Sequence, residues 1–340
     1  MSVSPRLPAA TITRDQALSA DLHQFPNDPL PGTVSSVASG ASGRRFFRIQ
    51  RGQNSRILMA YPEEPHENQL FTGIAGVLDA QHIPVPAIIA DAPEKGLVWI
   101  EDLGGQELYS LRERQDERRN AYEQALRALD QLQNLPAAAF SAANIETLPP
   151  FDEHLYHFEH QYFLEELHSR LHPGSEPSPA LETELDQLRE RLLAATTTWI
   201  HRDFQSKNLM VDPKGQIRLV DFQGIRHGHP YYDLASLLCD PYVNLPSSER
   251  THLFQYFCDL RSLSPEEEAP TYAAAACQRL MQALGAYGRF GLGGGVQFFS
   301  DKIPTALTLL QHHAKQAGLP ETERLSAALL ATFADGSSAE

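Results

Sequence analysis

The stretch that decides the fold begins at Trp199, ends at Val211 and reads WIHRDFQSKNLMV. A second short stretch, LVDF, follows at residues 219–222. Apolar residues stand on both sides of the polar part, as expected where buried strands hold a loop in place. Between the two stretches, Pro-Lys-Gly at residues 213–215 is typical of a tight turn. The pattern therefore predicts a loop, a short strand, a turn and a second strand.

Three oxygen-bearing side chains stand out in these stretches: Asp203, Asn208 and Asp221. The carboxylate of Asp203 can accept the proton of an attacking hydroxyl. The amide oxygen of Asn208 and the carboxylate of Asp221 are hard ligands of the kind magnesium prefers when it bridges the phosphates of ATP. The spacing is that of the H-R-D-x-x-x-x-N catalytic loop and D-F-x metal site of protein kinases, with Gln223 in place of glycine. Either aspartate alone could be a turn residue, but two stretches that agree in order and spacing favour phosphoryl transfer from MgATP.

Length, charge and cysteine content limit the possible functions. A chain of 340 residues is long enough for two domains or lobes. A net charge of −15 without any basic run argues against nucleic acid as the main partner. The three cysteines show no metal-ligand spacing and indicate buried thiols in a reducing compartment. Because we find neither a signal peptide nor a run of about 20 apolar residues, we expect a cytoplasmic protein that does not bind membranes.

A small-residue turn near the N-terminus is a candidate phosphate-binding hairpin. Residues 34–49 predict a strand, a turn rich in glycine and serine, and a second strand. Backbone N–H groups in such a turn can approach phosphate oxygens, although Gly-Ala-Ser-Gly is also typical of a plain hairpin. The candidate phosphate contacts are Ser42, Gly43, Arg44 and Arg45.

The next predicted strand, residues 57–61, departs from most kinase-like folds. Those folds carry a lysine here that contacts the α- and β-phosphates, whereas this chain has Met59 and no lysine nearby. Either another cation takes the place of the lysine, or the triphosphate depends more on magnesium. The candidate cations are Arg44, Arg45 and Arg48.

A hinge is predicted where the N-terminal strands end. A helical segment at residues 67–81 precedes two predicted antiparallel strands, residues 85–90 and 96–101. The second strand ends in an acidic, glycine-rich linker, which is where a two-lobe nucleotide enzyme would have its hinge. The candidate adenine contacts are the backbone groups of Glu101, Asp102 and Leu103.

The rest of the chain has the periodicity of helices. Asp233 is predicted to begin one of them and to support the catalytic loop rather than take part in chemistry. The glycine run at residues 291–295 predicts a loop that could cover a substrate. We therefore expect an α+β, protein-kinase-like two-lobe fold, with a small N-terminal antiparallel β-sheet lobe (residues 1–103) and a larger, mainly helical C-terminal lobe (residues 104–335). Its main helices are expected at residues 118–133, 151–171, 181–195, 277–287 and 305–317.

These motifs resemble the aminoglycoside phosphotransferase-like superfamily of small-molecule kinases. Within that superfamily, the chain is similar to the anomeric sugar kinases of bacterial cell-wall recycling, which phosphorylate the 1-hydroxyl of N-acetylmuramate and N-acetylglucosamine. The residues that carry the similarity to these sugar kinases are Ser42 to Arg48, Met59, Asp221 to Gln223, Tyr232 to Leu238 and Gln278 to Gly285.

The resemblance implies an ATP-dependent phosphotransferase that uses Mg²⁺. It implies that Asp203 is the catalytic base and that Asn208 and Asp221 hold the metal. It also implies that side chains of the helical lobe read the polar groups of a small-molecule acceptor, expected to be an amino sugar. The candidate acceptor contacts, each of which could instead be a surface or packing residue, are Gln205, Arg226, His229, Arg279 and Arg289.

Two other functions compete with a sugar kinase. The same chemistry could act on an aminoglycoside, on choline or on an amino alcohol such as homoserine. An acidic acceptor cleft would favour these cationic acceptors, whereas an arginine or histidine near the pocket would favour N-acetylmuramate. A nucleotide-binding scaffold without turnover is supported only by the missing strand lysine, and the intact Asp203, Asn208 and Asp221 oppose it.

Overall fold

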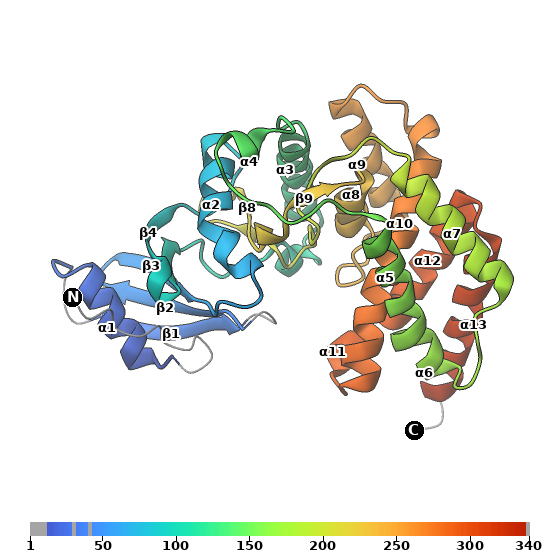
Figure 1. Ribbon diagram of the computed structural model, residues 1–340, viewed down its shortest axis with the longest axis horizontal. Coiled ribbons are helices and arrows are strands. Elements are labelled where there is room, and N and C mark those ends of the chain that lie inside the picture. The colour runs from blue at the N-terminus through green and yellow to red at the C-terminus, as the bar shows by residue number, and fades with distance from the viewer. Residues whose placement is uncertain (1–11, 29–31, 40–42, 338–340) are drawn as a thin grey trace. The chain divides into compact units, whose positions relative to one another are not determined.

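The structure is a computed structural model that describes residues 12–28, 32–39 and 43–337 (Figure 1). Ser42, one of the candidate phosphate contacts, lies outside the described residues. The chain forms two compact units, and the first takes in two segments from later in the sequence. Asp221 therefore belongs to the first unit, and Asp203 and Asn208 to the second. The first unit contains residues 1–106, 136–148 and 210–224, and the second contains residues 107–135, 149–209 and 225–340.

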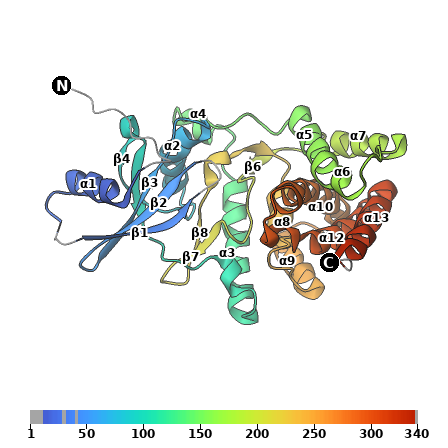
Figure 2. The same cartoon turned by 90° about the horizontal axis from the view of Figure 1, so that it is seen from below.

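The first unit is built on a five-stranded antiparallel sheet in the order β1-β2-β3-β5-β4. Helix α1 (Arg14–Gln24) lies against this sheet (Figure 2). Apolar side chains such as Phe47, Leu58 and Trp99 form the core between them, because alternate strand residues point to the same face. Asp21 of α1 is fully buried and accepts hydrogen bonds from strand arginines, which ties the helix to the sheet. The strands are β1 (Gly32–Ser39), β2 (Arg45–Arg51), β3 (Asn54–Ala60), β4 (Ile88–Ala92) and β5 (Leu97–Glu101).

A helix and a small hairpin complete the first unit. Helix α2 (Glu67–Ala80) packs against the short 3-10 turn η5 (Phe222–Gly224), where the rings of Phe71 and Phe222 stack with centroids 4.8 Å apart. The hairpin pairs strands β7 (Leu209–Val211) and β8 (Ile217–Leu219). It is the strand, turn and strand that the sequence predicts, and it leads directly to Asp221.

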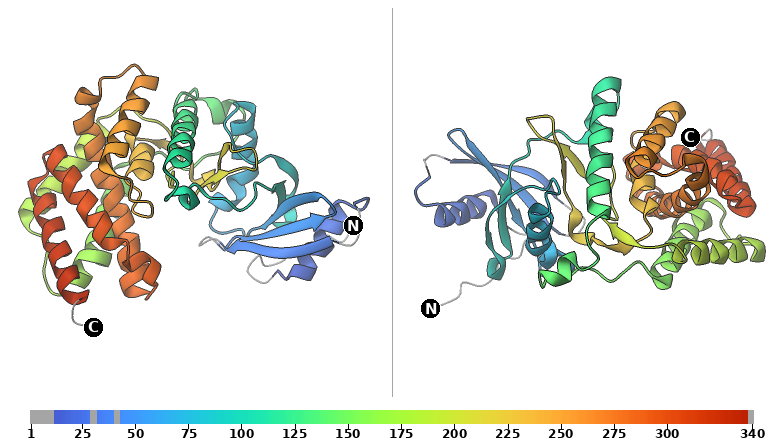
Figure 3. Two further views of the ribbon diagram at one scale, coloured as in Figure 1. Left: turned by 180° about the vertical axis from the view of Figure 1, so that it is seen from behind. Right: turned by 90° about the horizontal axis from the view of Figure 1, so that it is seen from above.

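The second unit is mainly helical and is organised around the long helix α10 (Pro265–Tyr287). Helices α5, α8 and α12 all pack on α10, and Figure 3 shows this bundle from behind, with α10 to α13 in orange to red. Just after α10, the backbone approaches the π-helical segment η4 (Leu164–His168) so closely that a Cβ at Gly288 would lie 2.2 Å from the carbonyl oxygen of Glu166. The unit also holds a short antiparallel pair, β6 (Thr198–Ile200) and β9 (Arg226–Gly228). Its longer helices are α3 (Gln115–Gln133), α5 (Glu153–Phe163), α7 (Pro179–Leu193), α8 (Tyr231–Leu238), α9 (Ser247–Leu260), α12 (Ile303–Ala317) and α13 (Pro320–Ser337).

The structure confirms the expected fold class, with a small antiparallel sheet in one unit and a larger helical part in the other. Two local predictions were wrong. Helix α8 begins at Tyr231 instead of Asp233, because Pro230 already has helical backbone angles and Asp233 falls in the first turn. The glycine run does not form a loop throughout, since a π-helical segment η6 (Gly288–Gly293) continues α10 as far as Gly293. Among the described residues, no helix has both the length and the apolarity that crossing a membrane requires.

Candidate active site

The predicted catalytic loop connects strand β6 of the second unit to strand β7 of the β7–β8 hairpin. Ile200 of β6 is fully buried, and inside the loop Phe204 is buried as well. The carboxylate-bearing side chain of Asp203 remains 40% exposed. The Asn208 amide nitrogen donates to the Asp203 carbonyl oxygen over 2.9 Å, so the amide oxygen of Asn208 is left to accept. The loop thus presents a carboxylate and an amide oxygen on a well-anchored backbone, which agrees with the predicted pattern.

Two buried aspartates hold the backbone of this loop. The Asp233 carboxylate accepts hydrogen bonds from the backbone N–H groups of His201 (2.6 Å) and Arg202 (2.9 Å). This contact helps fix Arg202 at φ +77°, a value that L residues rarely adopt. Burial raises the pKa of Asp233 to about 7, while the two backbone donors lower it. The predicted supporting role of Asp233 is confirmed.

The second aspartate, Asp240, was missed by the sequence analysis. It follows the end of α8, is buried, and accepts from the backbone N–H groups of Ser206 (2.9 Å) and Tyr242 (2.8 Å). Burial raises its pKa, and the hydrogen bonds with Ser206 lower it. No local pattern marks this residue, because its partner Ser206 lies on a different element of the fold.

A buried arginine lies near Asp203, the candidate catalytic base. Arg279 of α10 places Nη2 3.8 Å from Oδ1 of Asp203 and donates to the Ser236 hydroxyl (3.1 Å) and the Gln282 side-chain oxygen (2.6 Å). Burial lowers the pKa of Arg279, but its interactions with Tyr232 and Asp203 raise the pKa. The combined shift of the pKa is upward. The guanidinium is therefore charged and fixed beside the candidate base.

A pocket opens next to these groups in the second unit. It encloses about 230 Å³, including the space at its open side, and Gln205, Ser236 and Arg279 contribute polar atoms to its wall. Two predicted acceptor contacts, Gln205 and Arg279, thus meet beside the Asp203 loop. The remaining wall residues are Ala235, Cys239, Asp240, Pro241, Leu280, Ala283 and Tyr287.

The other three predicted acceptor contacts do not line this pocket. Arg226 is buried on β9. His229 is 2% exposed, its Nδ1 accepts from the Tyr231 N–H, and burial lowers its pKa to about 4. Arg289 is exposed, with its guanidinium 5.8 Å from the Phe290 ring centroid. His229 makes the contacts of a packing residue, and a direct role of these three in acceptor binding stays a prediction.

In the first unit, Asp221 is held in an unusual backbone conformation. Its φ is +64°, and the stacking of Phe222 on Phe71 anchors the adjacent position. Oδ1 of Asp221 accepts from the Arg44 guanidinium (2.5 Å) and from the Gln223 amide (3.0 Å). The glutamine that replaces the kinase glycine therefore binds the candidate metal ligand directly.

The structure separates the three arginines that could replace the strand lysine. Met59 itself is fully buried. Arg48 is committed to Asp102 through two hydrogen bonds (2.6 and 2.9 Å) and also donates to the Gly104 carbonyl. Arg45 donates to the carbonyl of Ile12. Arg44 contacts a predicted active-site group, the carboxylate of Asp221.

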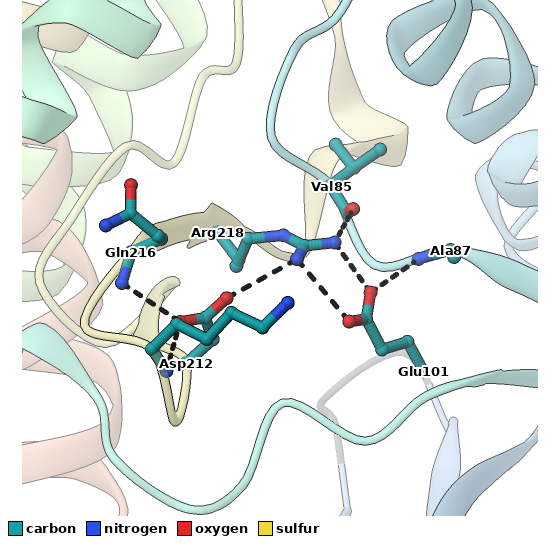
Figure 4. Close-up of polar contacts among 7 residues, drawn as sticks. Val85, Ala87, Glu101, Asp212, Gln216 and Arg218 are labelled. Carbon is teal, nitrogen blue, oxygen red and sulfur yellow. Dashed lines mark hydrogen bonds and ion pairs between the residues drawn. The ribbon is translucent and has the colours of Figure 1, made fainter.

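The predicted hinge residues use their side chains inside the first unit. The Glu101 carboxylate accepts from the Ala87 N–H (3.2 Å) and from Arg218 of β8 (2.6 Å), and Arg218 also lies 3.5 Å from Asp212 (Figure 4). Asp102 accepts from Arg48 and from the Gly104 N–H. Burial raises the pKa of Asp102, but its hydrogen bonds with Arg48 and Ser55 lower the pKa. The combined shift of the pKa is downward. These contacts fix the end of β5, next to the buried Leu103.

Comparison with known proteins identifies the family. The phosphotransferase enzyme family matches residues 33–287. The chain belongs to this family. Over 226 residues it is 31% identical to an N-acetylmuramate/N-acetylglucosamine kinase of Pseudomonas aeruginosa, a match that covers 64% of this chain and 62% of that protein.

Further relatives agree with this membership. A second N-acetylmuramate/N-acetylglucosamine kinase, from Pseudomonas putida, is 27% identical over 72% of this chain and 70% of its own length. Among solved structures, a choline/ethanolamine kinase family protein from Mesorhizobium loti superposes with a TM-score of 0.61. That superposition covers 94% of this chain and 99% of the other at 14% identity, which shows a shared fold.

Proposed function

We propose that this phosphotransferase is an ATP-dependent kinase that phosphorylates an amino sugar, with the anomeric 1-hydroxyl of N-acetylmuramate or N-acetylglucosamine as acceptor. The observation that carries the proposal is the Asp203 loop, whose exposed carboxylate lies beside a pocket lined by Gln205 and Arg279. The choice of acceptor follows the relatives, which are N-acetylmuramate/N-acetylglucosamine kinases. A cytoplasmic location and a role in cell-wall recycling are part of the same proposal.

In this proposal Asp203 accepts the proton of the acceptor hydroxyl. A positioned base within hydrogen-bond reach contributes to catalysis when the hydroxyl attacks. An anomeric hydroxyl is more acidic than an ordinary alcohol, so a carboxylate is a sufficient base for it. Asp233 and Asp240 hold the loop backbone through hydrogen bonds, and the Arg279 guanidinium lies 3.8 Å from the Asp203 carboxylate.

We assign Asn208 and Asp221 to the magnesium ion. The donors fit this metal, because both residues offer hard oxygen atoms and the amide nitrogen of Asn208 is already used by the backbone. A metal ion held by these two residues would offset the negative charge of the phosphates. Asp221 brings two carboxylate oxygens, one of which Arg44 and Gln223 orient.

The nucleotide is assigned to the N-terminal lobe, residues 1–103. The backbone of Glu101, Asp102 and Leu103 would pair with adenine, since the two acidic side chains are engaged elsewhere in the unit. Gly43, with φ +76°, and Arg44 and Arg45 would bind the phosphates. The acceptor is assigned to residues 104–335, where Gln205 and Arg279 line the pocket beside the Asp203 loop.

An acceptor screen tests the proposed function. ADP release should be coupled to an optical readout and measured with N-acetylmuramate, N-acetylglucosamine, an aminoglycoside, choline and homoserine, each with ATP and with GTP. We expect turnover with the two amino sugars and a phosphorus NMR signal of a sugar 1-phosphate. Turnover confined to the cationic acceptors would assign another substrate class, and no turnover with any acceptor would favour a scaffold.

Arg44→Ala should raise the KM for ATP about 10- to 100-fold. We expect this because Arg44, which contacts the Asp221 carboxylate, is the proposed replacement for the strand lysine, and a charge-assisted hydrogen bond contributes about 1.5–3 kcal/mol. Arg44→Lys should recover part of the affinity. Initial rates over a range of ATP concentrations measure the effect, with Arg14→Ala on the exposed surface of α1 as the control. An unchanged KM in Arg44→Ala would show that phosphate binding does not use this arginine.

A further inference from the structure

Lys207 of the catalytic loop lies in an aromatic cage. Its Nζ is 4.7 Å from the ring centroid of Phe298, 5.6 Å from that of Tyr109 and 5.8 Å from that of Tyr242. The rings come from three separate parts of the second unit: the 3-10 turn η3 (Leu108–Leu111), the segment after α8, and helix α11 (Gln297–Ser300). Such a convergence of rings attracts a cation and limits where its ammonium group can move.

The ammonium of Lys207 has no anionic partner in the described part of the chain. No carboxylate among those residues lies within 4.0 Å of its Nζ, whereas Arg279, the other cation near Asp203, is already engaged by three side chains. Aromatic faces supply no hydrogen-bond acceptor of the strength of a carboxylate, and an ammonium has three N–H donors. Lys207 is therefore a half-buried cation that the aromatic rings keep in place and that can still bind an anion.

The cage adjoins the pocket beside Asp203. Tyr242 follows Pro241, which lines the pocket, and its ring centroid is 5.8 Å from that of Tyr287, another pocket residue. Gln205 of the same loop lines the pocket too. The cage therefore adjoins the pocket, and Lys207 and Asp203 belong to the same loop.

We propose that Lys207 is a specificity-determining residue that binds a carboxylate carried by the acceptor. The inference rests on the proposed function and deepens it. N-acetylmuramate differs from N-acetylglucosamine by a lactyl ether that ends in a carboxylate, so the two sugars differ by one anionic group. Lys207 distinguishes them by pairing with that group, while both present the same anomeric hydroxyl to Asp203.

Lys207→Met tests the assignment, because methionine keeps the length and apolar stem and removes the charge. We expect kcat/KM for N-acetylmuramate to fall about tenfold or more, and kcat/KM for N-acetylglucosamine to change by less than about threefold, the difference being that of one charge-assisted hydrogen bond. Lys207→Arg should restore most of the preference. Lys315→Met, an equal charge change on the exposed side of α12, is the matched control.

The ratio of the two kcat/KM values separates recognition from a structural role. If Lys207 only braced the loop, both sugars would lose activity in parallel, and that result would overturn the assignment. An unchanged ratio in Lys207→Met would do the same. Should Lys207→Met fail to fold, Lys207→Gln supplies a second neutral side chain for the same comparison. Turnover of neither sugar by the wild-type protein would overturn the proposed function and this inference together.

Discussion

Replacing Asp203 by Asn should lower kcat about 10²- to 10⁴-fold, which is the contribution of a general base, and leave ATP binding nearly unchanged. The substitution keeps the size of the side chain and removes its ability to take the hydroxyl proton. The side chain is 40% exposed and its ion pair with Arg279 is long, at 3.8 Å, so the fold should tolerate the change. Steady-state rates at saturating N-acetylglucosamine and MgATP give kcat directly.

Asp259→Asn is the matched control for this experiment. Asp259 is an exposed carboxylate of α9 that accepts from Gln255 on the same helix, and its replacement should leave kcat unchanged. Melting temperature and nucleotide titration, measured on both variants, separate a lost base from a damaged fold. If Asp203→Asn turned over as fast as the wild-type protein, Asp203 would not be the base.

The fold could be predicted because its main signals are local. Alternation of apolar residues indicates the strands of the N-terminal sheet, and helical periodicity indicates α2, α3 and α12. The Asp203 and Asp221 motifs each lie within one short stretch, so their order and spacing are visible in the sequence. The π-helical continuation of α10 was missed because tertiary packing, such as the close approach of Gly288 to Glu166, contributes to it.

The contacts that complete the site could not be predicted, since they join residues far apart in the chain. The ion pair of Arg44 with Asp221 spans 177 positions, and no periodicity reports such a pair. The same holds for Arg279 beside Asp203 and for the cage around Lys207. Sequence reasoning supplied Arg44 and Arg279 as candidates, and only the structure gives them partners.

Residues that carried the family resemblance prove to share one buried network. The Tyr232 hydroxyl of α8 donates to the Glu159 carboxylate over 2.9 Å, and the Gln278 amide of α10 donates to it over 3.0 Å. Burial raises the pKa of Glu159 to about 7, while Gln278 lowers it. The neighbours of these residues, Asp233 and Arg279, contact the catalytic loop. The resemblance motifs on α8 and α10 therefore have a structural role, because their side chains link these helices to Glu159 of α5.

Asp221→Asn should raise the magnesium concentration needed for half-maximal activity about 100-fold, since altering groups that merely orient a ligand costs about 10- to 100-fold in metal affinity. The amide removes one negative charge from the candidate metal site and also weakens the ion pair with Arg44. The measurement is the initial rate at fixed ATP over a series of Mg²⁺ concentrations, repeated with Mn²⁺.

Asp212→Asn controls for the loss of a carboxylate in the same unit. Asp212 accepts from the backbone N–H groups of Lys214 and Gln216 in the β7–β8 turn, a task that an amide oxygen can perform (Figure 4). We expect a small fall in melting temperature and an unchanged magnesium requirement. Because Asp221→Asn disturbs both charge and packing, the decisive quantity is the metal requirement compared between the two variants at equal folded fraction. An equal requirement in both would remove Asp221 from the metal site and leave its contact with Arg44 as a structural one.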